Sequence, residues 1–331
     1  MSDKKHTKED LKIMQNWDLE RKIRVTQTRI IEWYQYYKGQ VYVSFSGGKD
    51  STVLLDLARR IYPDIEAVFI DTGLEYLEIK DFVKNKENVT IIKPEISFRQ
   101  VIDKYGYPVI SKEISKLIYG ARHGKNEEKR NNYKMRLDGF NVDGTYSKFK
   151  QSFKKYKYLL DAPFEISNRC CLQMKENPAR KYERKTNKKA IIGTMACESK
   201  QRTDGWLKTG CNAFESDLNI SKPMSFWTEQ DVLQYIKLTG IPYASVYGDL
   251  VKEWTNYKRK KNVPTGKLKM TGCQRTGCVF CAFGCHLEKE PNRFQMLKQT
   301  HPKLWEYCMK SWDEGGLGMK EVLEYIDVKY E

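Results

Sequence analysis

The sequence predicts an α/β fold in which a parallel sheet is flanked by helices, with a helical segment before it and a cysteine-rich helical region after it. Three observations lead to this fold class. Short apolar runs alternate with helical patterns between residues 41 and 92. Apolar residues recur at helical spacing from Leu11 to Trp33, before Gly39 interrupts them. All nine cysteines lie beyond residue 169. We therefore expect three parts, at 1–38, 39–240 and 241–331.

The composition limits the classes of function. A chain of 331 residues is long enough to bury a substantial core. Its net charge of +16 favours a polyanionic partner, although a solvated basic surface is the alternative. No apolar run approaches the roughly 20 residues of a membrane span, and the amino terminus is polar. We expect a cytoplasmic protein with no membrane contact, in which cysteines serve metal or redox chemistry. A homo-oligomer is compatible with this composition.

The segment 41–52 is the most informative stretch, because an apolar run turns abruptly on two glycines into a helix that we expect to open at Ser51. Such a junction binds anions through the unpaired N–H groups of the first helical turn. Ser46, Ser51 and Thr52 add hydroxyl groups and Lys49 adds a cation. The spacing matches neither the P-loop nor the dinucleotide fingerprint. The alternative is an ordinary strand–turn–helix junction with incidental serines.

The run Ser46-Gly47-Gly48-Lys49-Asp50-Ser51 resembles the signature of the PP-loop ATP pyrophosphatases, which have the adenine-nucleotide α-hydrolase-like (HUP-type) fold. Enzymes of that superfamily split ATP between its α and β phosphates and adenylate a substrate oxygen. The resemblance implies that this segment holds ATP and Mg²⁺. The residues implied in the loop are Ser44, Phe45, Ser46, Gly47, Gly48, Lys49, Asp50 and Ser51.

Two further strands are expected at 65–70 and 89–92, with a helix at 76–83 between them. This alternation predicts parallel strands joined by right-handed crossovers. Asp71, Thr72 and Gly73 follow the first of these strands, at the edge of the sheet where ligands bind. An ordinary βα turn would explain these three residues equally well. The superfamily resemblance implies that Asp71 and Thr72 lie at the adenosine or substrate end of the site.

Helices are expected at 97–105 and 113–119, and the pattern then breaks down over a basic insertion at about 122–158. Lysines alternate with aromatic residues there, for example in Lys154-Lys155-Tyr156-Lys157-Tyr158. Such a pattern suits phosphate contact and base stacking. A solvated insertion explains it equally well.

A strand expected at 190–196 leads into Cys197-Glu198-Ser199-Lys200-Gln201-Arg202. The arrangement G-x-x-x-x-E-S-x-x-R, which begins at Gly193, resembles an element of the phosphosulfate reductases. It implies that Gly193, Glu198, Ser199 and Arg202 belong to the nucleotide site, with Lys49, Asp50 and Arg202 as catalytic residues. A solvated arginine is the alternative. Residues 223–236 resemble another element of that family and predict a helix capped by Thr228.

The cysteines form a second informative group. Cys273, Cys278, Cys281 and Cys285 lie within thirteen residues, after the basic run at 258–261, and thiolates at such density favour zinc or iron–sulfur. The spacing alone does not choose the metal. Cys170-Cys171 followed by Lys175 and Pro178 resembles the iron–sulfur adenylylsulfate reductases, which implies a 4Fe–4S cluster. Its four ligands are expected among Cys170, Cys171, Cys273, Cys278 and Cys281, with Cys285 in reserve.

Other residues receive simpler interpretations. Cys211 and Cys308 are expected to be buried thiols, and His286 and His301 to be ordinary surface histidines. The regions 293–309 and 319–325 are expected to be helical and to close the fold.

The resemblance to the phosphosulfate reductases runs from about residue 41 to residue 285 and departs from them at two points. The loop is intact and suited to whole ATP, and no cysteine follows Cys308 to serve as the reductase nucleophile. The combined pattern is similar to the cluster-dependent tRNA thiolases and DNA phosphorothioation enzymes. It implies ATP-dependent sulfur transfer to tRNA or DNA, with a sulfur-donor protein such as a cysteine desulfurase. The alternatives are a phosphosulfate reductase, a sulfate adenylyltransferase, and a non-enzymatic ATP-binding regulator structured by zinc.

Overall fold

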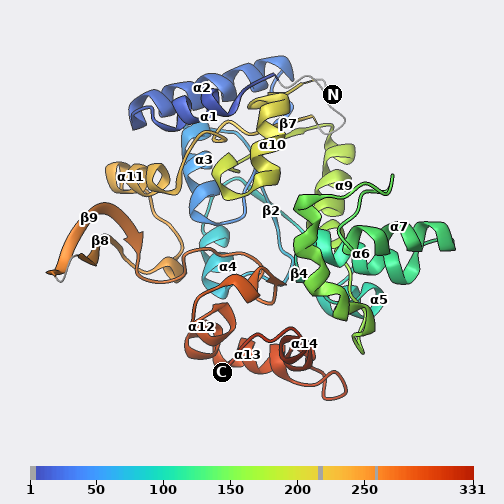
Figure 1. The fold of residues 1–331 in the computed structure, drawn as a ribbon. Helices are drawn as coiled ribbons and strands as arrows, with labels where there is room; N and C mark the ends of the chain where they lie inside the picture. Colours follow the sequence, from blue (N-terminus) through green and yellow to red (C-terminus); the bar gives the residue numbers. More distant parts are fainter. Residues whose placement is uncertain (1–4, 215–218, 258–259) are drawn as a thin grey trace. The chain divides into compact units, whose positions relative to one another are not determined.

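The computed structural model describes residues 5–214, 219–257 and 260–331, which form two compact units (Figure 1). Unit 1 comprises 1–71, 75–93 and 179–276, and unit 2 comprises 72–74, 94–178 and 277–331. The two units are thus interleaved along the chain. The three-part division at 38 and 240 remains a prediction.

Unit 1 is built on a six-stranded sheet with the order β3-β2-β1-β5-β7-β6. All neighbouring strands are parallel except β6 and β7, which are antiparallel. The predicted α/β fold class, with a mostly parallel sheet flanked by helices, is confirmed. The strands are β1 (Val41–Ser44), β2 (Ala67–Ile70), β3 (Val89–Ile92), β5 (Lys189–Ile192), β6 (Asn212–Ala213) and β7 (Ile220–Ser221).

Helices cover both faces of this sheet. Successive side chains of a strand point to opposite faces, and apolar side chains on each face are buried against helices. Val41 and Val43 of β1 belong to the large core that also includes α2 (Leu19–Tyr36) and α3 (Lys49–Arg59). Tyr42 points the other way and packs with Tyr182 of α9 (Asn177–Thr186). The central strands β1 and β2 are therefore mainly apolar on both faces, which explains the short continuous apolar runs at these positions.

Other helices of unit 1 follow local signals in the sequence. The helix α1 (Lys8–Gln15) begins at a capping box formed by Thr7 and Asp10, and the helical segment expected before Gly39 consists of α1 and α2. Thr228 caps α11 (Glu229–Thr239), as predicted. The remaining helices are α4 (Leu77–Lys84), α10 (Lys200–Thr209), and the short 3₁₀ turns η3 (Ala196–Glu198) and η4 (Ser245–Tyr247).

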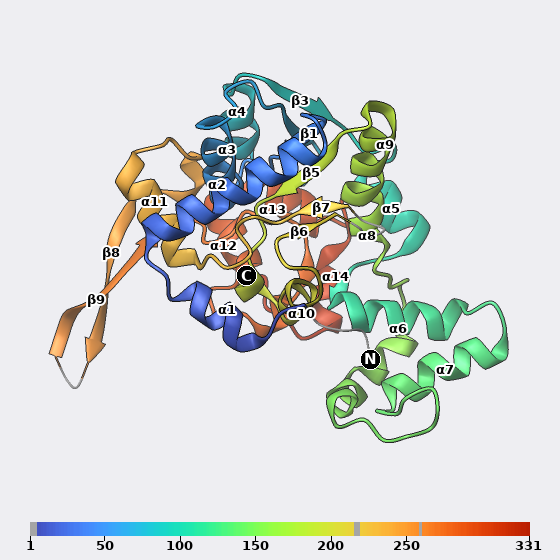
Figure 2. The ribbon, with the colours of Figure 1, turned by 90° about the horizontal axis from the view of Figure 1, so that it is seen from above.

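An antiparallel pair of strands in unit 1 was not predicted. It consists of β8 (Leu250–Tyr257) and β9 (Lys260–Met270), and Figure 2 shows it extending away from α11. Of the basic run at 258–261, Lys260 and Lys261 begin β9, and residues 258 and 259 lie outside the described residues. The strands escaped prediction because their pairing is irregular and they alternate poorly between apolar and polar residues.

Unit 2 is mainly helical, with a small parallel pair of strands, β4 (Val109–Ile110) and β10 (Ala282–Phe283). The expected helices at 97–105, 113–119, 293–309 and 319–325 are present, and the third is divided at His301. No helix of the described residues is both long and apolar enough to cross a membrane. The helices are α5 (Phe98–Tyr105), α6 (Lys112–His123), α7 (Glu127–Leu137), η1 (Lys148–Asp161), α8 (Arg169–Cys171), η2 (Leu172–Glu176), η5 (Cys285–Leu287), α12 (Arg293–Thr300), α13 (Pro302–Met309) and α14 (Met319–Tyr325).

The expectation that the helical pattern collapses over residues 122–158 was wrong, because α7 and η1 lie there. Asn126 caps α7 through its side chain, and the helix-forming residues that follow extend it. Only Leu137 of α7 is buried, so the helix carries almost no apolar periodicity. A pattern-based prediction consequently had nothing to detect.

Candidate nucleotide site and cysteine group

The loop between β1 and α3 forms the centre of the site in unit 1. Gly47 has a φ of +70°, and a Cβ atom there would lie 2.8 Å from Cγ2 of both Ile79 and Val83. Only glycine fits this position, because both its backbone conformation and its surroundings exclude a side chain. Gly48 precedes α3, which begins at Lys49 and not at Ser51 as predicted. The first helical turn therefore starts inside the serine–glycine run.

Two serines hold the loop closed. The Ser51 hydroxyl accepts a hydrogen bond from the Ser46 N–H at 3.2 Å and donates one to the Gly48 carbonyl at 2.9 Å. The Ser46 and Ser51 hydroxyls lie 3.1 Å apart, and Thr52 donates to the same carbonyl at 3.0 Å. These side chains shape the loop before any ligand arrives. Such preorganisation lowers the entropy lost on binding.

Lys49 is buried, yet its ammonium group is hydrogen bonded. Its Nζ atom donates to the Gln274 carbonyl at 2.9 Å and lies 3.2 Å from a carboxylate oxygen of Glu229. The ammonium also lies 5.5 Å from the centre of the Tyr247 ring. Its backbone N–H donates to the Tyr247 hydroxyl at 3.0 Å. Lys49 thus supplies both a cation and an N–H group at the start of α3.

Asp50 is the most unusual acid of this site. Burial raises the pKa of Asp50, and the nearby cation of Lys49 opposes that rise, as do Arg275 and Arg202. Its Oδ1 atom is enclosed and has no hydrogen-bond partner among the described residues. A buried acceptor without a partner is uncommon and points to a missing cation or donor.

The strand β5 brings the second predicted element to the loop. Ile192 pairs with Ser44 at the carboxyl ends of β5 and β1, and a Cβ atom on Gly193 would lie 3.2 Å from the Asp50 carbonyl. Glycine at this position allows the close approach of the two segments. The predicted residue Phe45 is buried in the core beneath the loop.

The spacing of Glu198, Ser199 and Arg202 has a physical explanation. Ser199 caps α10 by accepting a hydrogen bond from the Arg202 N–H at 3.3 Å. Glu198 accepts from the Met195 N–H at 2.8 Å and pairs with the Arg202 guanidinium. Burial, and then repulsion by Arg275, lowers the pKa of Arg202, while Asp50 opposes this effect. The structure therefore brings Arg202 close to the loop, fixed by its neighbours.

Sequence reasoning missed several residues that contact the loop. Tyr247 is buried. Its hydroxyl accepts a hydrogen bond from the Lys49 N–H and lies 2.7 Å from the Thr276 hydroxyl. Gln274 and Arg275 come from the segment that follows β9. Tyr247 gave no signal in the sequence, and Arg275 was passed over because it stands between two predicted metal ligands.

Asp71 and Thr72 fall in different units. Asp71 lies in unit 1, where its carboxylate is 2.8 Å from the Lys80 ammonium. Thr72 belongs to unit 2, and its hydroxyl accepts a hydrogen bond from the Leu74 N–H at 3.2 Å. Their assignment to the adenosine or substrate end of the site remains a prediction.

Four of the predicted cysteines come together in unit 2. Cys170 is buried, and burial raises the pKa of its thiol, with further contributions from Cys278, Cys171 and Cys281. Burial, and then the neighbouring Cys278, raises the pKa of Cys281 to about 11. The thiols of two distant segments, 170–171 and 278–281, are therefore electrostatic neighbours.

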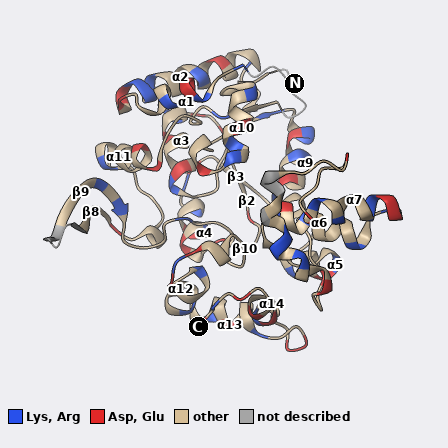
Figure 3. Ribbon diagram, viewed as in Figure 1, with Lys and Arg blue, Asp and Glu red and all other residues tan. Residues whose placement is uncertain are grey.

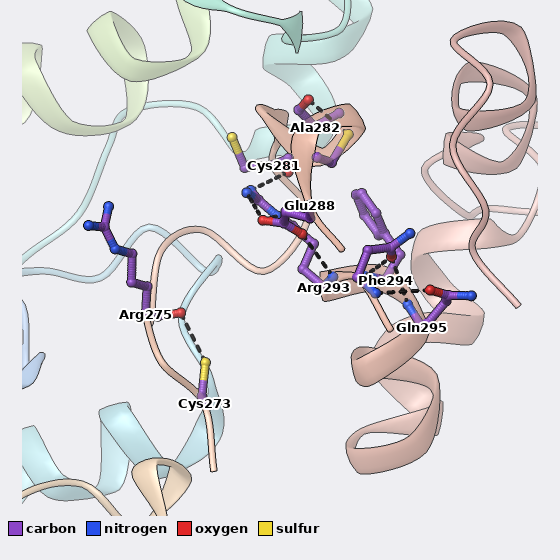
Figure 4. A network of polar contacts seen from close by, with 10 residues as sticks. Cys273, Arg275, Cys281, Ala282, Glu288, Arg293, Phe294 and Gln295 are labelled. Atoms are coloured by element: carbon purple, nitrogen blue, oxygen red, sulfur yellow. Dashed lines mark hydrogen bonds and ion pairs between the residues drawn. The ribbon is translucent and has the colours of Figure 1, made fainter. Parts of the chain in front are cut away.

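Arg293 anchors this group to the start of α12 (Figure 4). Its guanidinium donates to the Cys281 carbonyl at 2.9 Å and to the Glu288 carboxylate at 2.8 Å. Cys285, the reserve ligand, instead donates its thiol to the Ala282 carbonyl at 3.1 Å. The segment 281–293 is thus fixed by hydrogen bonds independent of any metal.

Cys273 belongs to unit 1, whereas the other four belong to unit 2. Its thiol donates to the Arg275 carbonyl at 2.9 Å. Within the described residues, no three or more cysteine, histidine, aspartate or glutamate side chains are arranged to hold a metal ion.

The predictions for the remaining cysteines and histidines had mixed outcomes. Cys211 and Cys308 are buried, as predicted. His286 differs from expectation: its Nε2 atom lies 3.1 Å from the Tyr156 hydroxyl, but its Nδ1 atom is enclosed and lacks a partner among the described residues. The ring is half-buried because Tyr156 of η1 packs against it edge-on.

Comparison with known proteins identifies the family. The family model described as the phosphoadenosine phosphosulfate reductase domain matches residues 40–116 and 125–283. The chain belongs to this family. The match includes the serine–glycine loop, the segment from Gly193 to Arg202 and the cysteine pairs, so the resemblance to the phosphosulfate reductases and the PP-loop superfamily is confirmed.

Relatives within the phosphoadenosine phosphosulfate reductase domain family are distant. An uncharacterized protein of Methanocaldococcus jannaschii is 24% identical over 304 residues, which cover 89% of this chain and 53% of that protein. An adenosine 5′-phosphosulfate reductase of Staphylococcus haemolyticus is 35% identical over 83 residues, or 23% of this chain and 34% of the reductase. This chain thus spans about half or less of the curated relatives' length. Named members of the family are enzymes.

A solved structure, a phosphoadenylyl-sulfate reductase from Candida auris in a phosphate complex, was also matched. It is 14% identical, covers 72% of this chain and 90% of its own, and has a TM-score of 0.36.

Proposed function

We propose that this protein cleaves ATP to AMP and pyrophosphate in order to adenylate a substrate oxygen, for iron–sulfur-dependent sulfur transfer to a nucleic acid. The observation that supports the first step is the set of charges at the loop of unit 1. Lys49, Arg202 and Arg275 all act electrostatically on Asp50 of this loop, and Asp50 has a carboxylate oxygen without a hydrogen-bond partner among the described residues. Cations and free N–H groups suit a polyphosphate.

A magnesium ion fits the same site. Mg²⁺ prefers carboxylate and phosphate oxygens, and the enclosed Oδ1 atom of Asp50 is such a ligand. A divalent cation bound there would also offset the free-energy cost of burying the negative charge of Asp50. Bound magnesium would neutralise charge on the phosphates.

The chemistry of the proposed reaction is a displacement at phosphorus. A substrate oxygen attacks the α-phosphorus, the bond from that phosphorus to the α–β bridging oxygen breaks, and pyrophosphate leaves with the electron pair. Lys49 and Arg202 stabilise the negative charge that develops on the phosphates. A sulfur nucleophile at the oxidation level of sulfide then displaces AMP from the adenylated substrate, so that no net oxidation or reduction occurs.

The cysteine group fits an iron–sulfur cluster. In a 4Fe–4S cluster each cysteine binds its own iron, so the four sulfurs lie farther apart than around a single ion. The proposal is supported by four thiols that are electrostatic neighbours, one for each iron: Cys170, Cys171, Cys278 and Cys281. Zinc is the alternative occupant. Such a cluster supplies redox and sulfur-binding chemistry when bound.

The proposed acceptor is a nucleic acid, tRNA or DNA, because the net charge of +16 favours a polyanion. The basic residues of 122–158 include Lys154 and Lys155, beside the aromatic Tyr156. A sulfur-donor protein such as a cysteine desulfurase completes the proposal.

The test is pyrophosphate release from ATP by anaerobically reconstituted protein, with and without nucleic acid. We expect release that nucleic acid stimulates and that the double variant Ser46→Ala, Asp50→Ala loses. Tyr36→Ala, an exposed change on α2, serves as the matched control and should keep full release. Unchanged release in the double variant would rule the mechanism out.

A second candidate, phosphosulfate reduction, is favoured by the family itself and by relatives named as adenosine 5′-phosphosulfate reductases. Sulfite release from adenylylsulfate with thioredoxin as the reductant distinguishes the two. Sulfite formation without pyrophosphate release from ATP would replace the sulfur-transfer proposal with this one.

A further inference from the structure

The pair of strands β8 and β9, here called the basic ribbon, has no part in the loop or in the cysteine group. Its base is anchored firmly. Leu250 and Leu268 pack against the main core of unit 1, and the Gln230 amide of α11 both donates to the Leu268 carbonyl and accepts from its N–H, each at 2.9 Å. The ribbon therefore holds a fixed position on its own unit.

Beyond this base the two strands pair only with each other, among the residues that the structure describes. The pairing shifts between Lys252 and Trp254, where the Thr265 hydroxyl donates to the Glu253 carbonyl at 3.2 Å and lies 2.9 Å from the Glu253 carboxylate. An isolated two-stranded sheet is marginally stable in water. Figures 1 and 2 show the pair of strands extending away from α11 of the same unit.

The exposed side chains of the ribbon include three lysines and a tryptophan. Lys252, Lys267 and Lys269 are exposed, and Trp254 retains 52% of its accessible surface. Figure 3 marks the basic positions of β9 in blue. The sequence of the ribbon and its tip contains a single acid, Glu253, against Lys252, Lys258, Arg259, Lys260, Lys261, Lys267 and Lys269.

We infer that the basic ribbon binds the nucleic-acid acceptor, with its lysines on phosphates and Trp254 stacked on an unpaired base. This inference rests on the proposed function. Lysine side chains neutralise phosphates without reading sequence, and aromatic rings stack on bases that are free of a duplex. Lysines on an exposed strand edge also prevent edge-to-edge aggregation, but that role does not account for an exposed tryptophan between them.

The test measures binding of a labelled single-stranded RNA, and of the corresponding duplex, over a range of salt concentrations without ATP. The variant Lys252→Gln, Lys267→Gln, Lys269→Gln should bind more weakly and lose about two units of salt slope. Its matched control, Lys8→Gln, Lys12→Gln, Lys185→Gln, removes the same charge from exposed positions of α1 and α9 and should keep the slope. Equal losses in both variants would overturn the inference.

Variants of Trp254 provide a second, independent test of the inference. Trp254→Ala should weaken binding of the single strand roughly tenfold and of the duplex much less, and Trp254→Phe should restore most of the loss. Leu238→Ala, at another exposed apolar position of unit 1, should have no effect. Undiminished binding by Trp254→Ala, or aggregation of the lysine variant with its affinity intact, would instead assign the ribbon to edge protection.

The outcomes separate this inference from the proposed function. If the ribbon variants bind nucleic acid normally while wild-type pyrophosphate release still responds to nucleic acid, only the ribbon inference fails. If the wild-type protein binds no nucleic acid, both the inference and the proposed acceptor fail.

Discussion

Tyr247 shows how a single residue shapes the site. Its hydroxyl accepts the Lys49 N–H, one of the first N–H groups of α3, and also contacts Thr276. A phosphate bound by this turn would compete for the same N–H. In the ligand-free loop, the Tyr247 hydroxyl therefore occupies the N–H group that a phosphate oxygen would use.

The variant Tyr247→Phe should lower the free energy of unfolding of the ligand-free protein by about 1–2 kcal/mol, because a buried N–H loses its acceptor. ATP supplies a new acceptor, so the stabilisation by ATP should be larger in the variant than in the wild type. Thermal unfolding with and without ATP measures both effects. Tyr243→Phe, a neighbouring tyrosine, is the control. Equal stabilisation by ATP in Tyr247→Phe and wild type would contradict this role.

Asp50 leads to a prediction about pH. Burial raises its pKa in the folded protein, so the folded state binds more protons than the unfolded state between the ordinary aspartate value and the raised one. Stability therefore falls as pH rises through this window, and the loss persists above it. Asp50→Asn should remove this loss, stabilise the ligand-free protein increasingly as pH rises, and abolish ATP cleavage. Melting curves across pH check it; a destabilised variant at neutral pH would refute it.

At the scale of elements, some predictions succeeded because their signals are local. The loop glycines, the Thr228 cap and the strand at 89–92 depend on neighbours in sequence. The contacts of Tyr247 and Gln274 with Lys49 depend on tertiary packing between distant segments, which no local pattern encodes. The helix α7 was missed for another reason, since it buries too little to show a period.

The contact between α2 and α11 illustrates such hidden packing. Lys22 and Asp231 form an ion pair at 2.7 Å with side chains only 2% and 11% exposed, and Asp231 also accepts from Thr228. Lys22→Met leaves a buried carboxylate without its cation and should cost about 3–5 kcal/mol in the free energy of unfolding.

The matched control for this change is Arg24→Met on the same helix. Its ion pair with Glu20 is solvent-exposed, so its removal should cost less than about 1 kcal/mol in chemical denaturation. Similar costs for both variants would show that the buried pair does not hold α2 against α11.

For the whole molecule, the chain passes repeatedly between the two units, and each unit gathers its residues from separate segments. The cysteines are an example, because 170–171 and 278–281 are far apart in sequence and are neighbours in unit 2. The sequence alone identified the two segments, but it did not exclude Cys273. The division into units assigns Cys273 to unit 1, and we predict on that basis that it is not a ligand.

Metal analysis of variants tests this assignment. Wild-type protein reconstituted anaerobically should hold about four irons and a matching amount of sulfide. Cys171→Ser and Cys281→Ser should each lose most of both, whereas Cys273→Ser and Cys285→Ser should retain them. Stoichiometric zinc in colourless wild-type protein, or loss of iron in Cys273→Ser, would overturn the proposed ligand set.

The most direct measurement of the central claim is product analysis with ATP labelled on its α-phosphate. Cleavage between the α and β phosphates predicts that the label appears in AMP or in an adenylated acceptor, with an equal amount of pyrophosphate. Label found in ADP with release of inorganic phosphate, or label left entirely in ATP when acceptor is present, would contradict the account.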